Sequence, residues 1–222
     1  MYTYLFINIA IIIFPLLFSF EKQIRFYRNW RAVFLSIAVV SSVFIIWDII
    51  FTARGVWSFN SDYLIGVNII GLPLEEILFF ITVPFSAAFI YEVAKLYLKE
   101  RIIEFKKDTF TSVATLFLFA GLWLWREEYT VVVLASCGIF FILAHYNKES
   151  LVKSILFWKT ILIIYVPFLI VNYILTSLPV VRYNDLENIG FRITTIPLED
   201  FFYSFSLISF SLFFYDRFKT KS

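Results

Sequence analysis

The sequence predicts an all-α integral membrane protein with seven transmembrane helices. The first reason is composition: 61% of the 222 residues are apolar, 16% are charged, and 48 are aromatic, as 29 Phe, 13 Tyr and 6 Trp. An ordinary soluble domain is about 45–50% apolar and about 25% charged. The chain is too apolar for a disordered protein, and a net charge of +2 is too small for a nucleic-acid binder. The composition therefore indicates that lipid is the solvent.

The second reason is a series of seven long apolar segments. Crossing roughly 30 Å of hydrocarbon takes about 17–25 helical residues. The first segment is not expected to be a cleaved signal peptide, because no basic residue precedes its apolar run and no small-residue cleavage site follows it. The expected spans are 2–20, 33–53, 74–97, 109–125, 129–146, 154–176 and 197–216.

The third reason is the unequal distribution of lysine and arginine. Fourteen lie after spans one, three and five and at the C-terminus, against four on the opposite side, while Lys159 can extend from span six to the basic side. Because basic residues favour the cytoplasmic side, we expect an outside N-terminus and a cytoplasmic C-terminus in the cell membrane. The fourteen are Lys22, Arg25, Arg28, Arg31, Lys95, Lys99, Arg101, Lys106, Lys107, Lys148, Lys153, Arg217, Lys219 and Lys221, and the four are Arg54, Arg126, Arg182 and Arg192.

The chain also contains an internal repeat with an offset of 124 positions. Fifteen of the 52 positions in 44–95 are identical in 168–219 without any insertion, among them Asn60 with Asn184 and the Pro-Leu-Glu of 73–75 with that of 197–199. We expect a first three-helix repeat over 1–98, a connector helix over 99–127 and a second three-helix repeat over 128–222. Parallel repeats of this kind are related by an axis along the membrane normal, so both copies of a motif share one depth and one side.

Each repeat opens a predicted span with paired acidic residues, Pro-Leu-Glu-Glu at 73–76 and Pro-Leu-Glu-Asp at 197–200. Proline and acids also suit an ordinary helix start, but ionisable residues at the edge of hydrocarbon are costly and usually mark a site or pathway. Asp48 and its equivalent Asn172 lie about one turn inside the same membrane edge, so we expect them to converge with the acids. The candidate catalytic residues are Glu75, Glu76, Glu199, Asp200 and Asp48.

If these carboxyl groups share an apolar pocket, as we expect, the chemistry predicted for the site is proton transfer. Desolvation and mutual repulsion keep some of them protonated, which places an acid beside a base. The single Cys137 and single His145 exclude a thiolate or histidine metal site. Aromatic faces would stabilise a carbocation formed from an apolar substrate, although aromatics also serve packing and interfacial belts. The candidate substrate-binding residues are Trp47, Phe79, Phe80, Asn172, Phe202, Tyr203, Asn60 and Asn184.

These features resemble the integral-membrane lycopene cyclases, which occur as two small bacterial subunits, as a fused chain or as a fungal domain. The resemblance rests on both acidic motifs, on Trp47-Asp48 ahead of the loop 55–60, and on the three-plus-one-plus-three plan. It implies a lycopene β-cyclase, an intramolecular lyase or isomerase that converts a C40 carotenoid to γ-carotene and β-carotene without net redox change, with the four acids of the paired motifs essential.

The same resemblance sets expectations for cofactor and partners. No Gly-x-Gly-x-x-Gly opens a βαβ unit, so no cofactor is expected. The expected partners are the lipophilic substrate, membrane lipid and other membrane enzymes of carotenoid synthesis. The second half departs from the first at Val171-Asn172, opposite Trp47-Asp48, which indicates unequal roles for the two halves.

Four other functions fit parts of the pattern. A small three-plus-one-plus-three transporter would use parallel repeats for alternating access, although the chain offers few polar groups for a sugar. A carotenoid end-group hydratase or a β-monocyclase would use similar cation chemistry. A retinal receptor fits less well, because predicted span seven has no lysine for a Schiff base.

Overall fold

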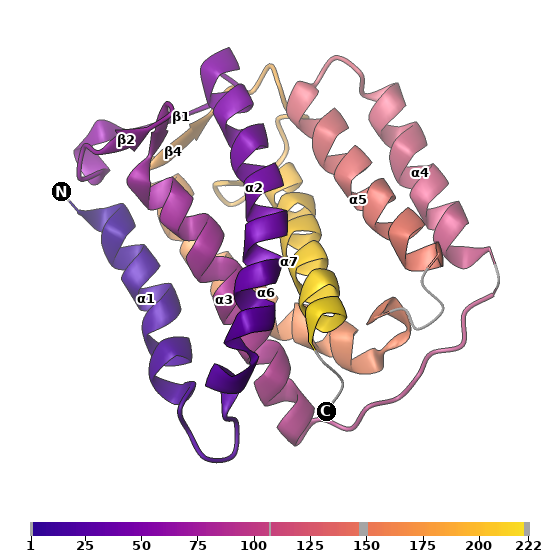
Figure 1. The fold of residues 1–222 in the computed structure, drawn as a ribbon. Helices are drawn as coiled ribbons and strands as arrows, with labels where there is room; N and C mark the ends of the chain where they lie inside the picture. Colours follow the sequence, from indigo (N-terminus) through magenta and orange to yellow (C-terminus); the bar gives the residue numbers. More distant parts are fainter. Residues whose placement is uncertain (1, 107, 147–150, 220–222) are drawn as a thin grey trace.

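The computed structural model describes residues 2–106, 108–146 and 151–219, and these residues form seven α-helices that follow the expected segments within a few positions (Figure 1). Lys107, Lys148 and Lys221 of the predicted basic side lie outside the described residues. The helices are α1 (Thr3–Phe18), α2 (Trp30–Arg54), α3 (Leu74–Tyr97), α4 (Thr109–Trp123), α5 (Glu128–Tyr146), α6 (Ile155–Ser177) and α7 (Leu198–Phe218). Short 3₁₀ turns are η1 (Phe26–Asn29), η2 (Ser61–Tyr63) and η3 (Leu151–Lys153).

Four of these helices, α2, α3, α5 and α6, are long and apolar enough to cross a membrane by length and composition. Helices α1 and α4 are shorter, with 16 and 15 residues, and α7 carries acidic residues in its first turn and a basic one in its last. The prediction of a mainly helical chain with several helices able to cross a membrane is confirmed. Crossing by α1, α4 and α7 and the orientation of the termini stay predictions.

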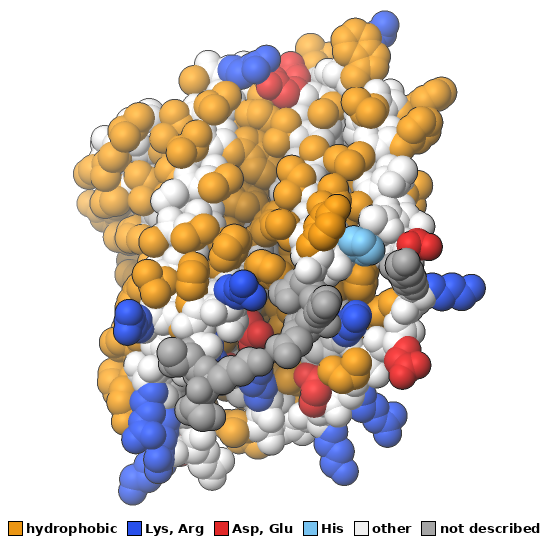
Figure 2. All heavy atoms as spheres, turned by 45° about the vertical axis from the view of Figure 1, so that its right-hand side comes forward, with side chains coloured by type: hydrophobic (Ala, Val, Ile, Leu, Met, Phe, Trp, Pro, Cys, Tyr) orange, Lys and Arg blue, Asp and Glu red, His pale blue; other side chains and the backbone are white. Residues whose placement is uncertain are grey.

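The helices run up and down between two ends of the molecule (Figure 1). We call the end that holds the strands and the start of α1 the strand end, and the opposite one the C-terminal end. On the face drawn in Figure 2, hydrophobic side chains form a broad band, and most Lys and Arg side chains gather toward the C-terminal end. This distribution matches the unequal basic count along the sequence.

Short strands at the strand end were not expected from the sequence. Strand β1 (Trp57–Phe59) pairs antiparallel with β4 (Val181–Tyr183), which joins the loops of the two halves. Strand β2 (Asn68–Ile69) pairs with β3 (Leu72–Pro73), and β5 (Arg192–Ile193) pairs with β6 (Ile196–Pro197). The last two hairpins have the same register, displaced by 124 residues.

Local sequence explains where the central helices begin and end. Pro73 and Pro197 stand directly before α3 and α7, and the acids that follow lie in the first turn, where negative charge complements the helix dipole. Gly55 ends α2 with a φ of 73°, a left-handed conformation that glycine adopts without steric cost. The paired acids are thereby placed at the strand end of two neighbouring helices.

Helices α3 and α7 lie at the centre of the bundle and contact each other. Toward the C-terminal end, Phe85, Phe140 and Tyr215 pack in one hydrophobic core. Glu92 of α3 accepts hydrogen bonds there from Lys219 at 2.8 Å and Lys95 at 3.0 Å. Lys219 thereby joins the second half of the chain to the first at this end.

Candidate functional site

A cavity of about 510 Å³ lies between α1, α3, α6 and α7. Its wall is mostly apolar, but three carboxyl groups line it: Asp48 from α2, Glu76 from α3 and Asp200 from α7. All three side chains are buried. The fold therefore brings acids that are 28 and 124 positions apart into one apolar chamber.

The three carboxyl groups interact with one another. Asp48, Glu76 and Asp200 line the same cavity, so their charges act on one another. Carboxyl groups that share an apolar site cannot all be ionised without a large electrostatic cost. Among the described residues, no group of three His, Cys, Asp or Glu side chains is arranged to hold a metal ion.

Asp48 and Glu76 accept hydrogen bonds from residues that the repeat alone does not identify. Trp57 donates through Nε1 to Asp48 Oδ1 at 2.5 Å, and Thr52 donates to the same oxygen at 3.1 Å. The Tyr4 hydroxyl donates to Glu76 Oε2 at 2.5 Å. These donors orient the two carboxyl groups from α1, α2 and strand β1.

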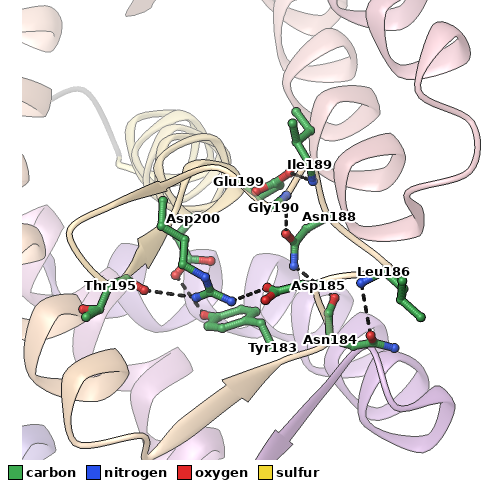
Figure 3. Close-up of polar contacts among 11 residues, drawn as sticks. Tyr183, Asn184, Asp185, Leu186, Asn188, Ile189, Gly190, Thr195, Glu199 and Asp200 are labelled. Carbon is green, nitrogen blue, oxygen red and sulfur yellow. Dashed lines mark hydrogen bonds and ion pairs between the residues drawn. The ribbon is translucent and has the colours of Figure 1, made fainter.

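Asp200 has a larger set of donors. Tyr129 donates to Oδ1 at 2.7 Å, while Tyr183 and Asn172 each donate to Oδ2 at 2.8 Å. Tyr183 extends toward Asp200 from strand β4 (Figure 3). Burial raises the pKa of the Tyr183 phenol, and the nearby Asp200 carboxylate raises it further, so the phenol keeps the proton that it donates.

The first acid of each motif is placed differently from the second. Glu75 Oε1 accepts from the backbone N–H of Ile65 at 2.6 Å, and Glu199 Oε1 accepts from that of Ile189 at 2.8 Å, 124 positions later (Figure 3). Glu199 Oε1 also accepts from the Thr130 hydroxyl at 2.6 Å. Glu75 and Glu199 are buried, but they lie outside the cavity lining and contact the loops at the strand end.

Some of the predicted substrate-binding residues line the cavity and others do not. Phe79, Asn172 and Tyr203 line the cavity, whereas the other five lie outside its lining. The Asn60 and Asn184 side chains accept from backbone N–H groups two residues later, at 3.2 Å and 3.1 Å, and so shape their loops. The aromatic residues outside the lining serve packing, and they are Trp47, Phe80 and Phe202.

Sequence reasoning missed Tyr4, Tyr129, Tyr183 and Trp57, all of which line the cavity. Tyr4 and Tyr129 occupy related places near the starts of α1 and α5, and each bonds to the second acid of one motif. Their offset is 125 rather than 124, so a comparison at one fixed offset does not align them. Tyr183 pairs with Trp57 across β1 and β4, a contact that only the fold creates.

A protein-family model described as Lycopene cyclase matches residues 1–94 and 126–218. No curated protein and no solved structure matches the chain. The matched residues contain both acidic motifs, the three cavity carboxyl groups and all the tyrosines that bond to them. By this match over most of its length, the chain belongs to the lycopene cyclase family.

Proposed function

We propose that this membrane enzyme cyclises the two ends of lycopene in turn, giving γ-carotene and then β-carotene. The observation that supports this proposal is the cluster of Asp48, Glu76 and Asp200 at one end of an otherwise apolar cavity. An apolar chamber suits a hydrocarbon, and adjacent carboxyl groups supply and remove protons.

The reaction requires one proton to enter and one to leave. A carboxylic acid adds its proton to the terminal double bond, which leaves a tertiary carbocation on the chain. The neighbouring double bond attacks this cation and closes a six-membered ring through a new C–C bond. A carboxylate then removes a ring proton and restores a double bond, so atoms, charge and oxidation state are unchanged overall.

We assign the roles of the three groups from their surroundings. We infer that Asp48 and Glu76 hold one proton between them, because two carboxylates that line one apolar cavity would repel each other strongly. This pair acts as the acid, and Glu76 on α3 is the member that donates the proton. Three donors stabilise the charged form of Asp200, which acts as the base.

Aromatic side chains beside the acids stabilise the cation. Phe79, Tyr203 and Trp57 line the same cavity as the carboxyl groups. A cation over an aromatic face gains about 0.5–2 kcal/mol, most where water is excluded. The site thus combines proton transfer with stabilisation of the intermediate.

The test is expression in a bacterium that accumulates lycopene, followed by separation and identification of the pigments. The unaltered chain should produce γ-carotene and β-carotene. Glu76→Gln and Asp200→Asn should each lower conversion by about a hundredfold or more, the usual contribution of acid–base catalysis. Asp216→Asn is the control, because its half-exposed carboxyl group lies on the same helix as Asp200 but at the C-terminal end.

Two other outcomes of this expression test would indicate a different function. A hydroxylated end group in place of a ring would make the chain a hydratase. Unchanged lycopene, with the unaltered protein well expressed in the membrane, would contradict the proposal and favour the transporter.

A further inference from the structure

The cavity opens to the side of the bundle, between α1 and α6. Among the described residues that line it, four are exposed, and all four lie on these two helices: Ala10 and Phe14 on α1, and Pro167 and Ile170 on α6. Phe14 is 65% exposed and Ile170 is 59% exposed. The residues that line the cavity from α2, α3 and α7 are buried or half-buried, so the opening lies between α1 and α6.

The opening lies at one depth on both helices. Ala10 is seven residues from the start of α1 at Thr3, and Ile170 is seven residues from the end of α6 at Ser177. At 1.5 Å per residue, both lie about 10 Å from the strand end of their helices. A hydrocarbon layer is about 30 Å thick, so the predicted spans 2–20 and 154–176 place this depth among acyl chains rather than in water.

The strand end of the cavity is closed. Trp57 and Tyr183 pair across β1 and β4, and both line the cavity beneath the sheet. Tyr4 and Ile7 of α1 pack with Leu175 and Val180 of the other half, which closes the gap between α1 and α6 above the opening. The exposed part of the cavity lining therefore lies at the side of the bundle.

We propose that the gap between α1 and α6, bordered by Ala10, Phe14, Pro167 and Ile170, is the portal through which one end of a long apolar polyene enters from the bilayer. This inference rests on the proposed function for the identity of the occupant. One end reaches Glu76 and Asp200 while the rest of the molecule stays among the lipids. A substrate with two reactive ends then dissociates and re-enters with its second end.

The chain provides a matched control for this portal. Ile170 and Ile46 are equivalent positions of the repeat, on α6 and α2, and their exposed fractions are 59% and 58%. Ile46 does not line the cavity. Ile170→Trp therefore adds bulk at the portal, and Ile46→Trp adds the same bulk to a lipid-facing surface elsewhere.

The test measures the initial rate of lycopene loss in membranes with equal amounts of each protein. Ile170→Trp and Ala10→Trp should each slow conversion at least about tenfold, the effect of a barrier higher by about 1.4 kcal/mol. Ile46→Trp should match the unaltered chain. Equal rates for Ile170→Trp and Ile46→Trp, with cyclised products from both, would overturn the portal and leave the proposed function standing.

A second measurement separates a blocked portal from a failed reaction. In a Glu76→Gln background, the lycopene that purifies with the protein is extracted and quantified. Ile46→Trp should retain it and Ile170→Trp should lose most of it. Equal retention in both would contradict the portal, whereas absence of cyclised product from the unaltered chain would contradict the proposed function instead.

Discussion

The two acids of each motif have different surroundings. Glu75 and Glu199 each accept a hydrogen bond from a backbone N–H of a loop, at equivalent positions of the repeat. Glu76 and Asp200 line the cavity instead. Successive residues of a helix point about 100° apart, so adjacent acids cannot face the same partner. We therefore expect the first acid to position the loop and the second to transfer protons.

Substitutions at Glu75 should separate these roles. Glu75→Gln keeps a carbonyl oxygen that can accept from Ile65 N–H, so it should retain most activity and stability. Glu75→Leu leaves this partly buried N–H unpaired and should reduce the free energy of unfolding by about 1–3 kcal/mol. Thermal unfolding in detergent together with pigment conversion checks this. Complete inactivity of a stably folded Glu75→Gln would instead show that Glu75 takes part in proton transfer.

The repeat positions Trp47 and Val171 show how the two halves differ beside the cavity. Val171 lines the cavity on α6. Trp47, its equivalent on α2, packs against Tyr203 with a ring separation of 5.0 Å and against Phe44 at 5.4 Å. The larger side chain fills the space that the smaller one leaves open.

At the scale of elements, the β1–β4 pair acts as a fixed cover over the cavity. Side chains of a strand alternate between its two faces. Trp57, Phe59, Val181 and Tyr183 line the cavity, whereas the intervening Ser58 and Arg182 are exposed. The cover ties together loops that lie far apart in the sequence and carries donors for Asp48 and Asp200.

Cross-linking this cover should leave catalysis intact. Ser58 and Arg182 are direct partners across the antiparallel pair, where Cα atoms lie about 4.5–5.5 Å apart, within the range of disulfides. The double variant Ser58→Cys, Arg182→Cys should form a disulfide under mild oxidation and convert lycopene at an unchanged rate. Loss of activity that a reducing agent restores would show that the cover has to open.

At the scale of the whole molecule, the two ends of the bundle carry different charged groups. Glu92, Lys95 and Lys219 form an ion-pair network that joins α3 to α7 at the C-terminal end. Glu76 and Asp200 of the site lie in the first turns of α3 and α7, at the strand end. The topology predicted from the basic residues places this strand end outside the cell.

Labelling of intact cells tests that orientation. A membrane-impermeant maleimide should react with Ser58→Cys in the exposed cover and should reach Lys99→Cys only after the membrane is opened. The native Cys137 is buried and should stay unlabelled in both variants. The reverse labelling pattern would invert the topology and place the cluster near the cytoplasmic side.

Much of this protein was predictable from its sequence. The apolar segments gave helices within a few residues of the observed bounds, because the need to satisfy backbone hydrogen bonds in lipid leaves few alternatives to a helix. The convergence of Asp48 with Glu76 and Asp200 followed from depth and from the repeat. The short strands were not predictable, because ladders of two or three residues leave no periodic pattern.

By itself, the sequence determined the helical membrane class, the depth at which acids gather and the family resemblance, because hydropathy and repeated motifs act along the chain. Only the tertiary structure decided which acids share the cavity, which tyrosines bond to them and where the cavity opens. The rotation of each helix about its axis decides these features. That rotation depends on packing between residues as distant as Tyr4 and Glu76, which no local pattern records.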